Sequence, residues 1–225
     1  MRTLAVAFAS AALTASAAYG QSVLSAHSGV VHYILGNVWI EDKQVELKFG
    51  HFPDVKPNET IRTEDGRAEM LLSPGSFLRI GENSAVRMVS NQLTDTRFEL
   101  LKGEILVETV DFTKDSAAAK VKGNIITVAF KNTTTILEKP GLYQFHAEPG
   151  SVQVYEGEAL VKSADASLTL KRGHRTMLEG VLLSEKFDSR NGDELTRWSA
   201  RRSSELAMAM RSPWKDHHAD RSTLQ

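Results

Sequence analysis

The chain has 225 residues, of which 41% are hydrophobic and 24% charged, and this composition excludes a wholly disordered protein. The 27 Lys and Arg residues and 28 Asp and Glu residues give a formal net charge of −1. Nucleic-acid-binding proteins need a surplus of cationic groups, so we expect no nucleic-acid partner. The absence of cysteine excludes disulfides, thiolate metal sites, iron–sulfur clusters and cysteine nucleophiles.

Residues 1–20 have the three-part pattern of a secretory signal peptide. Arg2 supplies a positive charge, residues 4–13 form an apolar run with one serine, and small residues follow up to Gly20. The apolar run is shorter than the ~20 residues of a membrane-spanning helix, so a cleavable signal is predicted rather than an anchor. Cleavage is predicted after Gly20, with Ala17 as the alternative, which leaves residues 21–28 as an N-terminal lead. We therefore expect a periplasmic or secreted protein without a later transmembrane segment.

Apolar and polar residues alternate with a period of two through residues 29–186. The runs are four to six residues long, as in 67–71, 77–80 and 105–108, and glycine or Pro-Gly turns separate them. About a dozen such runs predict an all-β domain of many short antiparallel strands. The alternation predicts sheets with one buried and one wet face. A sandwich of two sheets or one twisted, solenoid-like roll would both bury the apolar faces, and the sequence leaves both open.

Residues 187–225 are predicted to form a loop, one α-helix and a polar tail. The segment 193–210 lacks Gly and Pro and is rich in good helix formers. Asp193 and Glu194 stand at its start, where the helix dipole favours negative charge. Pro213 follows the segment and ends the predicted helix.

Five stretches in a fixed order carry a resemblance to a known family. They are residues 36–39, 61–72, 73–84, 101–107 and 154–161. On these stretches residues 29–180 resemble the FecR-like domain family of exported bacterial proteins, here as a stand-alone member. The resemblance implies an all-β fold and a location outside the cytoplasm. The best-known members are transmembrane regulators with a cytoplasmic anti-sigma region. We expect neither that region nor a membrane span in this chain, so the resemblance is not taken to imply sigma-factor regulation.

The sequence predicts no catalytic residue, no cofactor and no metal site. No two histidines have the i,i+4 spacing of a helical zinc motif, and His217 and His218 lie in a polar tail. No Gly-x-Ser-x-Gly motif is present to expose a serine nucleophile. Several glutamates alternate with apolar residues, which predicts that most lie on a wet sheet face rather than in a glycosidase pair. These are Glu69, Glu99, Glu104, Glu108, Glu156 and Glu158.

Trp198 stands among arginines on the predicted helix. Tryptophan and arginine dominate binding hot spots, so Trp198, Arg201 and Arg202 are candidate partner contacts. The favoured interpretation is that the helix docks Trp198 onto the β-domain and leaves the arginines in water.

These observations together favour a non-enzymatic, exported interaction or scaffold module of the bacterial cell envelope. Its partner is expected to be another envelope protein or a surface polysaccharide. One alternative is a carbohydrate-binding or carbohydrate-active β-protein, which requires an exposed aromatic strip or a carboxylate-lined cleft. The other alternative is a diverged envelope signalling regulator.

Overall fold

A computed structural model describes residues 28–48, 52–110 and 124–210, and the side chains of residues 209 and 210 are outside that description. The predicted signal peptide and polar tail lie outside the described residues. Within them are fifteen strands and one helix, which confirms the predicted all-β class with a C-terminal helix. The elements are β1 (Val30–Ile40), β2 (Lys43–Gln44), β3 (Thr60–Ser73), β4 (Ser76–Ile80), β5 (Ala85–Gln92), β6 (Asp95–Lys102), β7 (Glu104–Thr109), β8 (Ile125–Phe130), β9 (Thr133–Leu137), β10 (Gly141–Ala147), β11 (Gly150–Glu156), β12 (Glu158–Lys162), β13 (Ser167–Lys171), β14 (His174–Met177), β15 (Glu185–Lys186) and α1 (Glu194–Met210).

All fifteen strands belong to one hydrogen-bonded sheet. Its order is β13-β12-β9-β8-β6-β5-β3-β4-β7-β10-β11-β14-β15, with β1 paired to β3 and β2 paired to β1. The described pairs are antiparallel apart from β6 and β8, which run parallel. This exception arises because the chain leaves β6 to form β7 between β4 and β10, and then returns to β6. A parallel pair needs such a crossover, whereas a tight turn is enough for an antiparallel pair.

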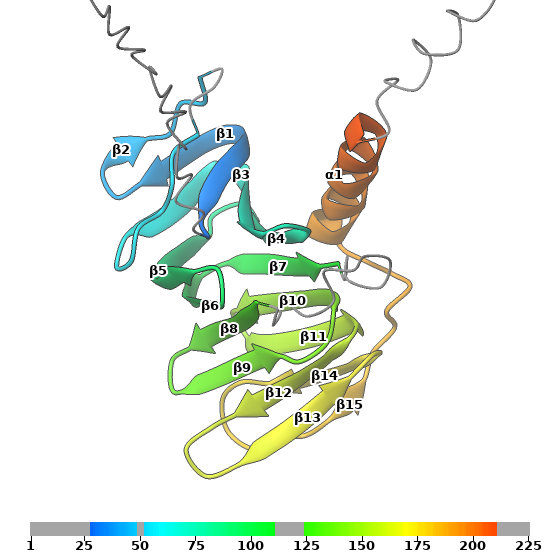
Figure 1. Ribbon diagram of the computed structural model, residues 1–225. Coiled ribbons are helices and arrows are strands. Elements are labelled where there is room, and N and C mark those ends of the chain that lie inside the picture. Colours follow the sequence, from blue (N-terminus) through cyan, green and yellow to red (C-terminus); the bar gives the residue numbers. More distant parts are fainter. Residues whose placement is uncertain (1–27, 49–51, 111–123, 211–225) are drawn as a thin grey trace, which may run out of the picture.

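Strand β3 is long enough to pair with two different strands, β5 and β4, along different parts of its length. Residues 60–62 of β3 pair with β5, and residues 68–73 pair with β4. Figure 1 shows β8, β9, β12 and β13 in front of β10, β11, β14 and β15. Strand β13 approaches β11 and β14, and β10 approaches β6, although these strands are not hydrogen-bonded neighbours. The sheet therefore folds back on itself. Of the two architectures that the sequence left open, the structure has the roll and not the sandwich of two separate sheets.

The core lies between the two layers and follows the predicted alternation. Leu78 and Ile80 of β4 point inward, and Ile105 and Val107 of β7 do the same. Other fully buried core residues include Ile61, Met70, Leu72, Leu100, Phe98, Tyr143, Phe145, Val152, Val154, Ala159 and Val161. The residues between them on each strand point to the outer face of the roll.

The turn between β11 and β12 shows why glycine is required there. Gly157 has a φ of +93°, and an added Cβ atom would lie 2.0 Å from the hydroxyl oxygen of Tyr143. That hydroxyl accepts a hydrogen bond from the backbone N–H of Glu158 at 3.0 Å and donates to the carbonyl of Lys139. Gly173 also has a positive φ, of +76°, but nothing lies within 4 Å of the position of its Cβ.

Helix α1 lies beside β4 and the end of β7 (Figure 1). It contacts the outer face of the sheet, opposite to the core. Among the described residues, no helix combines the length and the apolar character that crossing a membrane requires.

Candidate functional site

The sheet face beneath α1 carries a row of residues that stand directly opposite one another. Glu69 of β3 is paired with Arg79 of β4, Arg79 with Leu106 of β7, and Leu106 with Gln144 of β10. Because their strand neighbours fill the core, these four side chains point outward. All four are fully buried, so α1 and the adjoining residues cover a face that would otherwise be wet.

A small apolar cluster joins the helix to this row. Leu195 and Trp198 of α1 pack on Leu106, and Tyr33 and Leu142 pack against the same cluster. Only 5% of Trp198 is exposed. The rings of Trp198 and Tyr33 are tilted at 44° with their centroids 6.2 Å apart, within the range of favourable aromatic pairs.

Arg79 is the centre of a buried polar network under the helix. Its Nε donates a hydrogen bond to Glu69 Oε2 at 2.6 Å, and its guanidinium also contacts Glu108. From the helix, Ser199 Oγ lies 2.6 Å from Nη1 and Ser203 Oγ lies 3.0 Å from Nη2. A buried charge pair is tolerated when its remaining donors and acceptors are satisfied, and the helix supplies these partners.

Arg202 brings a second guanidinium to Glu69. Its Nη2 donates to Glu69 Oε1 at 2.9 Å, and its guanidinium carbon lies 3.7 Å from the centre of the Tyr33 ring. The expectation that Arg202 faces water is therefore wrong, because Arg202 is 9% exposed. Glu69 also departs from the expected wet face. It does point outward, but α1 covers it and Arg79 and Arg202 neutralise its charge.

The three candidate partner contacts thus have different surroundings. Trp198 and Arg202 are buried against the sheet, and Arg201 is exposed on the outer side of α1. Of these three side chains, Arg201 is the one that a partner could reach without displacing the helix. The role of all three in partner binding stays a prediction.

The first turn of α1 is held by acidic residues. Asp193 precedes the helix and caps it, because its Oδ1 accepts from the backbone N–H of Thr196 at 2.9 Å. Glu194 Oε1 lies 2.6 Å from Arg67 Nη2, and the hydrogen bond from Arg67 lowers the pKa of Glu194. Arg67 also pairs with Glu82 at 2.8 Å. These contacts are consistent with the sequence-based expectation that negative charge favours this helix end.

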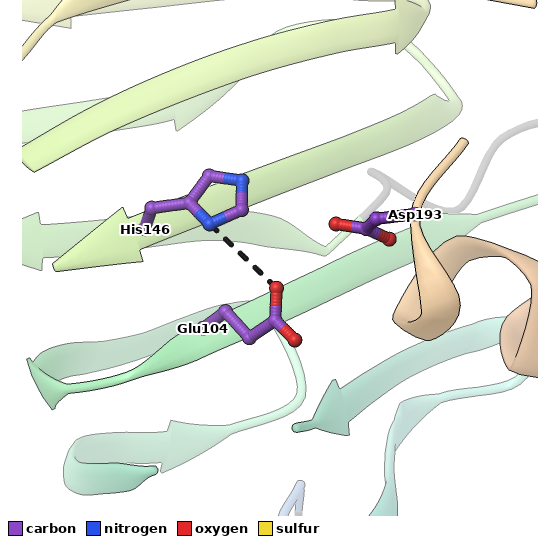
Figure 2. Close-up of side chains that lie close together, drawn as sticks. All are labelled: Glu104, His146 and Asp193. Atoms are coloured by element: carbon purple, nitrogen blue, oxygen red, sulfur yellow. Dashed lines mark ion pairs between the residues drawn. The ribbon is translucent and has the colours of Figure 1, made fainter. Parts of the chain in front are cut away.

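Close to this cap, the side chains of Glu104, His146 and Asp193 come together. Glu104 of β7 and His146 of β10 are directly paired across the two strands, with Glu104 Oε2 3.6 Å from His146 Nδ1. Asp193 reaches them from the start of the helix, and Figure 2 shows the three side chains turned toward one another. One potential ligand atom from each residue lies within 4.8 Å of the other two. We call these three residues the Glu-His-Asp cluster.

The partial burial of the Glu-His-Asp cluster affects its protonation. Burial, followed by the negative charge of Asp193, raises the pKa of Glu104. Burial lowers the pKa of His146 despite the charge of Asp193. Although burial opposes it, hydrogen bonds from Thr196 and Gln144 hold the pKa of Asp193 below its ordinary value. At neutral pH this favours a neutral imidazole beside an ionised Asp193, and neutral imidazole is the form that binds metals.

A buried amide orients both carboxylates of the cluster. Gln144 Nε2 donates to Glu104 Oε2 at 3.3 Å and also to Asp193 Oδ2. Gln144 Oε1 accepts from the hydroxyl of Tyr155 at 3.0 Å, which fixes the direction of the amide. The cluster is therefore supported by neighbours that set its geometry.

The sequence pattern did not predict this cluster. Glu104 was expected on a solvent-exposed sheet face, and His146 has no histidine partner at i,i+4 spacing. The three residues come from two strands and a helix cap, and their proximity depends on the pairing register of β7 with β10 and on the docking of α1. Local spacing carries no signal for either.

Comparison with known proteins gives a family match and a likeness to solved structures. Residues 59–160 match the family model described as FecR protein, which confirms the family resemblance. Two crystal structures of a protein from Parabacteroides distasonis ATCC 8503, proposed to be an anti-sigma factor, are similar. One has 13% identity and a TM-score of 0.48, covering 62% of this chain and 64% of that chain. The other has 14% identity and a TM-score of 0.46, covering 61% and 62%. The chain thus spans less than two thirds of those structures. No curated protein matches it.

Proposed function

We propose, from the FecR domain that this chain carries over residues 59–160, that the protein is an exported, non-enzymatic binding module of the bacterial cell envelope. The family match supports an envelope setting. Export rests on the signal-peptide pattern of residues 1–20, which lie outside the described residues. The partner that the surface favours is another envelope protein.

The observation that carries the proposal is an apolar surface at one end of the sheet. Met177 ends β14, and Val181 and Leu183 lie on the connection to β15. Their exposed fractions are 42%, 76% and 62%. We call these three residues the edge patch. Single exposed apolar residues are common, whereas exposed apolar residues that gather together mark candidate interaction sites, and these three lie within seven positions of the chain.

The edge patch is held in place by its neighbours. The backbone N–H of Leu183 donates to Thr176 Oγ1 at 3.1 Å, which ties the connection to β14. Leu178 is buried in the core, and Leu182 packs against the core from the same connection. The inward residues anchor the segment, and this anchoring leaves Val181 and Leu183 in solvent.

The chemistry of the edge patch favours a protein over a polysaccharide. Its side chains are aliphatic or thioether, whereas carbohydrate platforms use aromatic faces. Among the described residues, Phe52 is the one aromatic side chain in the set of large exposed hydrophobics. Strand β15 is also the last strand of the sheet on this side, so its outer edge can accept a strand from a protein partner.

The test is the double variant Val181→Glu, Leu183→Glu, compared with Leu35→Glu. Leu35 is 51% exposed but lies on β1, away from β14 and β15 in the sheet order. Chemical cross-linking in intact cells, followed by purification of the protein, should capture an envelope protein with the wild type and the Leu35 control. The double variant should lose that protein while it keeps the wild-type melting temperature. Equal capture by the folded double variant, or binding to purified surface polysaccharide with no protein captured, would overturn the proposal.

Export is tested separately by cell fractionation and N-terminal sequencing. The mature chain is expected in the periplasm or medium with Gln21 as its first residue. A chain that begins at Ala18 would indicate the alternative cleavage site and would still support export. A full-length chain that stays in the cytoplasm would contradict export.

A further inference from the structure

We propose that Glu104, His146 and Asp193 bind one divalent transition-metal ion, with Zn²⁺ as the probe, and that the ion ties α1 to the sheet. This inference goes beyond the proposed binding function, because it concerns another part of the molecule and does not depend on any partner. It also departs from the sequence-based expectation that the chain has no metal site.

The geometry of the Glu-His-Asp cluster suits a single ion. Three atoms no more than 4.8 Å apart can all lie within about 2.8 Å of one common point. Zinc bonds to histidine nitrogen and carboxylate oxygen are about 2.0–2.2 Å long. Movements of less than about 1 Å at the ends of the three side chains would therefore complete the coordination.

The donor set indicates the class of metal. Imidazole nitrogen favours zinc and other first-row transition ions over Ca²⁺ and Mg²⁺, which prefer sites made of oxygen alone. One imidazole and two carboxylates supply three ligands, and this leaves a position for water. The side chains of Glu104 and His146 are 31% and 24% exposed, so an ion can reach the cluster from solvent.

Gln144 is an independent observation in favour of a built site. It is fully buried, and its amide donates to both carboxylates of the Glu-His-Asp cluster. Tyr155 in turn holds the amide oxygen. Metal sites are commonly surrounded by such outer hydrogen bonds, which orient the ligands. Oδ1 of Asp193 accepts the capping hydrogen bond from Thr196, whereas Oδ2 accepts from Gln144 and faces the cluster.

The charges around the cluster favour a cation. One carboxylate oxygen each of Glu104 and Asp193 lies within 4.8 Å of the other, and the negative charges of Asp193 and Glu194 disfavour the ionised form of Glu104. Arg67 is the nearby counter-charge, but it is already paired with Glu82 and Glu194. A divalent ion would relieve the repulsion between the two carboxylates.

Binding is tested by titrating Zn²⁺ into the chelator-treated full chain, with calorimetry and thermal unfolding as readouts. We expect one ion per chain and a melting temperature that rises with Zn²⁺ concentration, because an ion that binds the folded state stabilises it. Ca²⁺ should bind more weakly. Ca²⁺ that binds as tightly as Zn²⁺ would contradict a histidine ligand.

The ligands are tested with His146→Gln, Glu104→Gln and Asp193→Asn. Asparagine caps helices as well as aspartate does, so Asp193→Asn removes the charge and keeps the cap. Each should abolish stoichiometric Zn²⁺ binding, while the melting temperature without metal shows that the variant is folded. Gln144→Leu removes a supporting hydrogen bond and should weaken binding about 10- to 100-fold.

Two controls separate this site from other histidines. His174→Ala changes a histidine outside the cluster, and His217→Ala, His218→Ala removes the adjacent pair in the tail. Both should bind Zn²⁺ as the wild type does. The proposal is overturned if binding is lost with the tail variant, if it persists in folded His146→Gln and Glu104→Gln, or if the wild type binds no Zn²⁺.

Discussion

Arg79 and Glu69 stand directly opposite each other on β4 and β3, with Arg79 Nε 2.6 Å from Glu69 Oε2, and neither side chain has exposed surface. Their pairing alone does not satisfy both groups. Ser199, Ser203 and Arg202 of α1 supply the remaining partners. The buried polar groups of this sheet face therefore have all these partners only when the helix is docked. Polar contacts as well as apolar burial stabilise the docked helix.

The first prediction concerns the charge of Glu69. Glu69→Gln keeps the shape of the side chain but leaves Arg79 and Arg202 without their shared anion. Removing one partner from a buried ion pair should lower the free energy of unfolding by about 3–5 kcal/mol, as measured by urea denaturation. Arg97→Met is the control, because Arg97 pairs with Asp95 in solvent, and it should leave the urea midpoint unchanged. Equal effects from the two substitutions would contradict a buried network.

The second prediction concerns Trp198. Trp198→Ala removes the largest side chain of the cluster that joins α1 to Leu106 and should cost about 3–5 kcal/mol of unfolding free energy. The exposed Met208 lies on the same helix, and Met208→Ala should have almost no effect. Limited proteolysis adds a second readout, because an undocked helix is cut sooner. A protease-resistant helix with an unchanged melting temperature would mean that Trp198 does not hold α1 in place.

The third prediction compares two turn glycines. Gly173→Ala places a Cβ atom in open space at positive φ, and the left-handed conformation should cost about 1–2 kcal/mol. Gly157→Ala has the same conformational cost and also collides with the Tyr143 hydroxyl, so its loss of stability should be clearly larger. Thermal and urea unfolding of both variants measure the difference. Similar losses would show that the turn can move away from Tyr143.

The fourth prediction is a pH dependence at His32. Burial lowers the pKa of His32 from its ordinary 6.5, and the nearby charges are Glu69 on β3, Arg79 on β4 and Arg202 on α1. The folded state thus binds this proton less readily than the unfolded state. The stability contributed by neutral His32 is full above about pH 6.5 and is lost as the pH falls toward the lowered pKa.

Urea denaturation at several pH values between about 7.5 and 5 tests the role of His32. His32→Gln, which cannot be protonated, should lose less stability than the wild type over that range. Nε2 of His32 lies 3.3 Å from Glu69 Oε1, so glutamine can still face the carboxylate. Identical pH profiles for the two proteins would show that His32 does not contribute to acid sensitivity.

Local pattern was sufficient to predict the class of the fold. The period-two runs become strands because each one buries alternate residues, as at Leu78 and Ile80, and the segment from Asp193 becomes a capped helix. The pattern could not choose between a sandwich and a roll, since both place the same residues inside. The local pattern also could not predict that β6 and β8 pair in parallel, because this pairing depends on the position of β7 between β4 and β10 in the sheet.

The surroundings of charged residues were predicted less well, for a related reason. Glu69 does point away from the core, as its alternation implies, but alternation does not show what lies on the outer face. Arg202 was expected in water because arginine usually is, yet its guanidinium packs on the ring of Tyr33 and donates a hydrogen bond to Glu69. The Glu-His-Asp cluster depends on the same helix docking and on the register of β7 with β10, so local spacing could not predict that its three members lie together.

The boundaries of the family match have a practical consequence for work with fragments. Residues 59–160 start just before β3 and stop inside β12, which runs from Glu158 to Lys162. A polypeptide cut at those points would lose β1, the long neighbour of β3. It would also lose α1, which covers Glu69 and Arg79. The segment that matches the family model is therefore shorter than the packed unit, which also includes β1 and α1. Expression of a minimal soluble piece should begin with residue 28 or earlier and extend through α1.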